Sequence, residues 1–144
     1  MAVDPVSGKV TTRIDLPGCK GAHGVRIHPD GNNAFVASED NSLIARVELC
    51  GAHAVVTAQT GQDPDVLGID REFGWLYVAA ESGDLTVFDI NQPGHVLIDR
   101  EHSGDHSHSV AVDPATHRVF FPLMAGPNGK PALHIMQPKL CEKQ

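Results

Sequence analysis

Residues 65–90, DVLGIDREFGWLYVAAESGDLTVFDI, contain three short runs that are rich in β-branched and aromatic residues. The two turns between these runs carry Gly74 and Gly83, and both turns also carry acidic residues. Short runs of this composition, bounded by glycine and acidic residues, are typical of antiparallel strands joined by tight turns. The stretch therefore predicts an antiparallel meander, and the rest of the chain repeats this unit.

Two further copies of the unit flank the first one. Its first run recurs around His23 and His108, so that 42 positions separate His23 from Asp65 and 43 separate Asp65 from His108. Aromatic residues repeat at the same spacing: Phe35, Tyr77 and Phe120. A period in the low forties with about four strands is typical of a β-propeller blade. The sequence therefore predicts an all-β fold of about three four-stranded antiparallel blades, which is a half-propeller.

The repeat divides the chain, which we expect to be a single β-propeller segment over residues 1–144. The expected parts are the strands of an incomplete blade (1–17), blade one (18–60), blade two (61–103) and blade three (104–138). The incomplete blade supplies an outer strand over residues 9–16, and blade three begins with an inner strand over 108–113. Blade three lacks its outer strand, because the few residues after Pro138 are too polar to form one.

Composition excludes several classes of protein. The apolar content of 41% is ordinary for a folded domain, and a formal charge of −7 disfavours a nucleic-acid binder, which needs a basic face. No run approaches the roughly 20 apolar residues of a membrane helix, so no membrane contact is expected. The N-terminus has no signal-peptide pattern, so the chain as it stands is expected in the cytoplasm. Three cysteines far apart predict neither a disulfide framework nor a zinc site: Cys19, Cys50 and Cys141.

Several motifs resemble a known family of bacterial propellers. The matching segments are 22–25 (AHGV), 29–31 (PDG), 35–38 (FVAS), 64–67 (PDVL), 76–83 (LYVAAESG) and 108–114 (HSVAVDP). They resemble the YVTN repeat, and the YncE-like members in particular. The resemblance implies a propeller fold but no common catalytic residues. Members are usually about twice as long, close a ring of about seven blades and are often exported, so this chain resembles the C-terminal half of one.

Three residues are candidate metal ligands because they occupy equivalent positions in successive blades. His23, Asp65 and His108 each stand where the chain leads into an inner strand, so we expect them to form an arc facing the channel. His106 stands close behind this arc in the sequence. Imidazole and carboxylate groups that converge there suit a divalent transition metal, or an anionic small molecule. The alternative is that each side chain only closes its own turn by bonding to backbone groups.

Other polar and aromatic residues have structural interpretations. Asp70, Asp113 and His28 end the inner strands at the opposite side, where a side chain that bonds to a following backbone N–H explains them. Trp75 and Tyr77 are expected to pack between blades rather than to form a stacking platform. No nucleotide-binding, serine-hydrolase or zinc-protease motif is present.

These observations favour a non-catalytic module that binds a small ligand or a protein partner on its channel face. One alternative is a metal-dependent, lactonase-like hydrolase that uses the arc and a metal-bound water. Another is an isolated half-propeller without activity of its own.

Assembly follows from ring closure, because propellers have at least four blades. The outer strand at residues 9–16 has no blade of its own, and blade three lacks such a strand. The sequence therefore predicts a homodimer in which exchange of this strand closes a six-bladed ring.

Overall fold

The computed structural model describes residues 1–139 and is almost entirely β-structure. Its strands are β1 (Ala2–Val3), β2 (Val10–Thr12), β3 (Ala22–Ile27), β4 (Asn33–Ser38), β5 (Leu43–Glu48), β6 (Val55–Gln59), β7 (Pro64–Asp70), β8 (Trp75–Ala80), β9 (Asp84–Asp89), β10 (Val96–His102), β11 (Ala111–Val112), β12 (Val119–Leu123) and β13 (Ala132–Met136). In this part of the chain, one 3₁₀ turn, η1 (Glu39–Asn41), is the sole helical element. The predicted all-β fold is confirmed.

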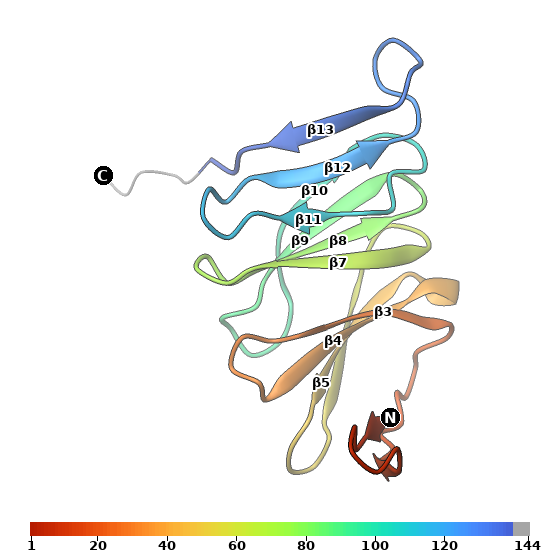
Figure 1. The fold of residues 1–144 in the computed structure, drawn as a ribbon, viewed down its shortest axis with the longest axis vertical. Coiled ribbons are helices and arrows are strands. Elements are labelled where there is room, and N and C mark those ends of the chain that lie inside the picture. The colour runs from red at the N-terminus through yellow and green to blue at the C-terminus, as the bar shows by residue number, and fades with distance from the viewer. Residues whose placement is uncertain (140–144) are drawn as a thin grey trace.

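The strands form three antiparallel sheets in chain order, with a separate hairpin of β1 and β2. Two sheets have four strands, β3-β4-β5-β6 and β7-β8-β9-β10, and the third has β11-β12-β13. Figure 1 shows these sheets stacked one above another, with the N-terminal hairpin at one end of the stack and β13 at the other. We call the three sheets blades one, two and three.

The blades adhere through apolar faces. Phe35 and Ile44 of blade one pack with Leu76 and Phe88 of blade two in one buried cluster. A second cluster joins the other face of blade two to blade three and includes Tyr77, Val110, Val119 and Phe121. Blade two is therefore covered on both faces, which explains why β8 reads as a continuous apolar run rather than an alternating one. The expected packing role of Tyr77 and Trp75 between blades is confirmed.

Two strands are shorter than the sequence predicts. β11 covers only Ala111 and Val112, instead of residues 108–113. Ala111 lies opposite Phe120, so continuing this antiparallel register would set Val110 opposite Phe121 and then Ser109 opposite Pro122. Pro122 has no N–H to donate, so the ladder stops before it. β2 covers three residues of the predicted 9–16, because its partner β1 has only two.

Three expectations concern further parts of the chain. Cys19 and Cys50 are free thiols, whereas Cys141 lies outside the described residues. Most of the segment after Pro138, for which no strand is predicted, also lies outside the described residues. Within residues 1–139 there is no helix long and apolar enough to cross a membrane.

Candidate functional site

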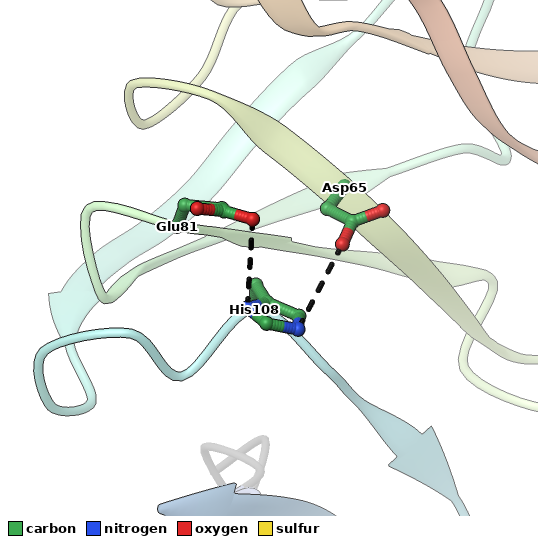
Figure 2. Close-up of side chains that lie close together, drawn as sticks. All are labelled: Asp65, Glu81 and His108. Carbon is green, nitrogen blue, oxygen red and sulfur yellow. Dashed lines mark ion pairs between the residues drawn. The ribbon is translucent and has the colours of Figure 1, made fainter. Parts of the chain in front are cut away.

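Three blade-derived segments bring an imidazole and two carboxylates together. Asp65 lies in β7, Glu81 follows the end of β8, and His108 lies just before β11. Figure 2 shows His108 with one ring nitrogen facing each carboxylate. One ligand atom from each of the three residues lies within 4.8 Å of the others. We call Asp65, Glu81 and His108 the Asp65 cluster.

A β-bulge explains why Asp65 leaves the ordinary pattern of its strand. The pairing of β7 with β8 shifts between Pro64 and Val66, so Asp65 is the extra residue of the bulge. The same shift occurs in β3, between Ala22 and Val25, and it frees His23 in blade one. Bulges re-aim side chains and are common beside functional sites. Equivalent bulges in two blades thus point His23 and Asp65 at each other.

The contacts of His108 leave it free to bind. Its Nε2 lies 4.0 Å from Asp65 Oδ2, and its Nδ1 lies 3.8 Å from Glu81 Oε1. Both separations exceed hydrogen-bond length. Nδ1 is moreover buried and has no hydrogen-bond partner within residues 1–139. A buried polar atom without a partner is unfavourable, and a bound ion or molecule would relieve it.

His23 contributes to the cluster indirectly. Its Nδ1 lies 2.5 Å from Asp65 Oδ1, while the other carboxylate oxygen, Oδ2, faces His108. The arrangement fixes the orientation of the Asp65 carboxylate and leaves Oδ2 available. The sequence-predicted His23, Asp65 and His108 therefore do lie together, with Asp65 between the two histidines.

Glu81 is the member that sequence reasoning did not include among the ligands. Glu81 is far from Asp65 in the sequence but close to it in space. The antiparallel pairing of β7 with β8 brings the end of β8 back beside the start of β7, where Pro64 pairs with Ala80. The expected hairpin of β7 and β8 was therefore the sequence feature from which the proximity of Glu81 to Asp65 could have been predicted.

His106 is near the cluster but is not joined to it. The residue is exposed and has a left-handed backbone, with φ 59°. It lines a shallow pocket of about 340 Å³ with His108, Pro122 and Met124. No ion pair of His106 occurs in the described part of the chain, so this residue stands at the rim.

The electrostatics of the cluster favour a cation. Every ion pair among residues 1–139 has a histidine as its cationic member, so no Lys or Arg neutralises Asp65 or Glu81. Two carboxylates therefore face one imidazole with a net negative charge. Imidazole nitrogen and carboxylate oxygen together are ligands of divalent transition metals.

A second histidine with two acidic neighbours differs in one respect. His102 Nδ1 lies 3.2 Å from Asp84 Oδ1, and its Nε2 lies 3.1 Å from Asp105 Oδ1. Both ring nitrogens are thus within hydrogen-bond distance of an acceptor. His102 has partners already, and His108 does not.

The residues expected to be structural behave as predicted. Asp70 Oδ1 accepts the backbone N–H groups of Glu72 and Phe73, and Asp113 Oδ1 accepts that of Ala115. His28 Nδ1 likewise accepts the N–H of Asp30.

The sequence did not predict a second role for Asp70. This buried carboxylate also bonds through Oδ2 to Nδ1 of His117, at 2.8 Å. His117 in addition stacks on Phe73, with ring centroids 4.1 Å apart. The contact ties the turn before β12 to the turn after β7, so Asp70 is a link between blades.

Comparison with known proteins shows the fold. No family model and no curated protein matches the sequence. Among solved structures, hydrazine synthase of Kuenenia stuttgartiensis is similar with a TM-score of 0.68 and 16% identity, over 90% of this chain and 36% of that one. A protein of Bacteroides uniformis assigned provisionally as a 6-phosphogluconolactonase has a TM-score of 0.61 and 16% identity, over 92% and 47%. The dihydro-heme d1 dehydrogenase NirN has a TM-score of 0.61 and 19% identity, over 94% and 32%.

These neighbours are β-propeller proteins, so the predicted half-propeller architecture is confirmed at the level of fold. At identities below 20%, the likeness carries no activity with it. The chain also spans less than half of the length of each neighbour described above.

Proposed function

We propose that this chain is a non-catalytic β-propeller module that binds a divalent transition metal ion at the Asp65 cluster. One observation carries the proposal: His108, Asp65 and Glu81 converge while the buried Nδ1 of His108 has no hydrogen-bond partner among residues 1–139. Bound ligand atoms about 2.1 Å from one ion lie roughly 3–3.6 Å apart. Only one ring nitrogen of His108 can bind the ion, and the three ligand atoms lie within 4.8 Å of one another, so side-chain rotations must bring them about 1 Å closer together.

The donor set selects the class of metal. Calcium and magnesium prefer oxygen ligands alone, whereas imidazole suits zinc, copper and nickel. A site with one nitrogen and two carboxylate donors thus favours Zn²⁺ or Ni²⁺ over Ca²⁺. His23, whose Nδ1 forms an ion pair with the Asp65 carboxylate, would act as an orienting group rather than as a ligand.

Calorimetric titration with ZnCl₂ tests the proposal, on protein purified without an affinity tag and treated with a chelator. The parent chain should bind one Zn²⁺, and His108→Ala should abolish that binding. His23→Ala should keep the stoichiometry and weaken affinity about 10–100-fold, as the loss of an orienting partner does. Affinity should fall in mildly acidic buffer, because protons compete with the ion for imidazole.

A matched control separates the cluster from acidity in general. Asp105→Asn removes an exposed carboxylate that also neighbours a histidine, His102, so it should leave the titration unchanged. Asp65→Asn should weaken binding strongly. No zinc uptake by the parent chain, or equal effects of the two substitutions, would contradict the proposal and leave the turn interpretation of these residues.

A metal-dependent, lactonase-like hydrolase is the second candidate. The observation in its favour is the neighbour from Bacteroides uniformis that is assigned provisionally as a 6-phosphogluconolactonase. A bound metal would supply an activated water at the channel face. Zinc-dependent opening of 6-phosphogluconolactone that Asp65→Asn abolishes would favour the enzyme. Zinc uptake without turnover favours the binding module.

A third possibility is that the chain is one part of a propeller with no activity of its own. The coverage of its structural neighbours agrees with that interpretation, since 36% to 47% of two of them is matched. Within the propellers, we infer from the motifs at residues 64–67 and 108–114 a place in the YVTN-repeat, YncE-like group.

A further inference from the structure

The two end faces of the blade stack expose side chains that the internal interfaces bury. Val25 and Ile27 of β3 are 50% and 53% exposed, whereas Leu67, at the equivalent place in blade two, is 1% exposed against blade one. At the other end, Leu133 and Ile135 of β13 are 58% and 50% exposed. We call these the first face, of β3, and the last face, of β13.

The last face repeats the chemistry of an internal interface. In blade two, the residues equivalent to Leu133 and Ile135 are Leu85 and Val87, which are 3% and 8% exposed. Leu85 and Val87 pack against blade three in the second apolar cluster. What covers the last face should therefore resemble the front of a blade, and the chain exposes such a front at β3.

A groove lies between blades two and three, on the outer side of the stack. Its volume is about 400 Å³, and its lining includes Trp75, Ile98 and Met136. The buried hydroxyl of Tyr77, also in the lining, has no hydrogen-bond partner within the described residues. In blades one and two a fourth strand, β6 or β10, flanks the third strand, whereas no strand within residues 1–139 lies on the outer edge of β13.

The N-terminal hairpin supplies what blade three lacks, an outer strand without a blade. β2 pairs only with β1 and with no blade. Val3 and Val10 of this hairpin are 48% and 44% exposed. The hairpin lies beside blade one, at the end of the stack away from β13 (Figure 1). A fourth strand that belongs to the blade before blade one would occupy the same side.

We propose that a second copy of this chain covers these surfaces, in an isologous dimer that forms a six-bladed ring. The first face of each copy packs on the last face of the other, and β2 of each copy lies beside β13 of the other. Both contacts follow from one placement, because a copy stacked before blade one presents its own β13 next to the hairpin. This inference does not depend on metal binding.

Charge and exposed strand edges favour this occupant. The charged residues of the groove are Asp99, Glu101 and Lys139, so acidic groups outnumber basic ones there, and the β2 region supplies Lys9 and Arg13. An open strand edge such as that of β13 is a template for pairing with another strand. Two three-bladed stacks also make a ring within the four to eight blades of known propellers.

Light scattering across a concentration series of the 144-residue chain tests the proposal. The parent chain should be a dimer at micromolar concentration. Val10→Asp and Ile135→Asp should each raise the dissociation constant at least tenfold, because each places a charge at the junction. Val6→Asp is the matched control in the same hairpin, since Val6 lies in its turn and is 95% exposed. It should change the constant less than twofold.

Mixing the two variants distinguishes a dimer with two reciprocal β2–β13 junctions from nonspecific association. A heterodimer of Val10→Asp and Ile135→Asp chains has one intact junction, so the mixture should associate more tightly than either variant alone. Trp75, the one tryptophan in the chain, lines the groove and should shift its emission to shorter wavelength on association.

Circular dichroism first establishes that each variant is folded, and Leu133→Asp replaces Ile135→Asp if that variant is not. A folded parent chain that stays monomeric at 100 μM would overturn the proposal, and would assign the end faces to other polypeptide. Equal effects of Val6→Asp and Val10→Asp, or no gain on mixing, would also overturn it.

Discussion

At the scale of single residues, Gly24 shows how closely two blades approach at the candidate site. A Cβ atom on this residue would lie within 1.9 Å of the backbone carbonyl oxygen of Asp65. Backbone cannot yield as a flexible side chain can, so blade one reaches the Asp65 cluster only because Gly24 has no side chain. The glycine therefore helps to set the contact between His23 and Asp65.

Gly24→Ala should lower the free energy of unfolding by about 3 kcal/mol, since relief of the overlap requires β3 to move away from β7. Urea unfolding followed by circular dichroism measures the change. Gly68→Ala is the control, because its Cβ would meet the side chain of Val112 at 3.1 Å, and that side chain can adjust. We expect less than about 1 kcal/mol there. Equal losses would show that Asp65 does not constrain blade one.

The same residues show what a sequence reveals about a site. Equivalent positions in a repeat were enough to bring His23, Asp65 and His108 together, since equivalent strands face one channel. The two β-bulges that aim His23 and Asp65 were not predictable, because register depends on the partner strand. Glu81 was missed as a ligand for that reason. The early end of β11 could have been predicted from Pro122, because proline has no N–H for strand pairing.

At the scale of elements, the connection between β9 and β10 anchors blade two to blade one. His95, in this connection, lies edge-on to Phe35 and Phe88, with ring centroids 6.0 and 5.4 Å away. Burial, and secondarily the Arg46 guanidinium, lower the pKa of His95 from 6.5 to about 4. Neither ring nitrogen has a hydrogen-bond partner within residues 1–139, so the neutral ring serves as an apolar wedge.

The lowered pKa makes stability depend on pH. The unfolded chain takes up a proton at His95 below about pH 6.5, whereas the folded chain does so only near pH 4. The part of the free energy of unfolding that depends on neutral His95 is therefore complete above pH 6.5 and is lost as pH falls toward 4. Allowing for solvent screening, we expect a loss of about 1–2 kcal/mol between pH 7 and pH 5. Urea unfolding at these pH values measures it.

His95→Leu should remove most of this pH dependence, because leucine keeps an apolar side chain in the wedge without a group that titrates. His106→Asn, which removes an exposed histidine and tolerates its left-handed backbone, is the control and should leave the dependence in place. A pH dependence unaltered in His95→Leu would assign it to other histidines.

At the scale of the whole molecule, stability is concentrated in blade two. Leu76, Tyr77, Val78 and Ala79 of β8 are all buried, because blade one covers one face of this strand and blade three the other. Stacked repeats contact only their neighbours, so a central repeat gains from two interfaces and a terminal repeat from one. Protection should decrease from β8 toward both ends of the stack.

Native-state hydrogen exchange, on the Val10→Asp chain to keep it monomeric, tests this gradient. Amides of residues 76–79 should exchange only through global unfolding, whereas those of β2 and β13 should exchange through local opening. In the parent chain at high concentration, β13 should become more protected. Uniform protection in the monomer would show that the three blades unfold as one unit.

Histidine is the basic member of every ion pair in residues 1–139. Lysine side chains therefore belong to none of these pairs. Chemical acetylation of the lysine amines, which removes their positive charge, should leave every one of the pairs in place.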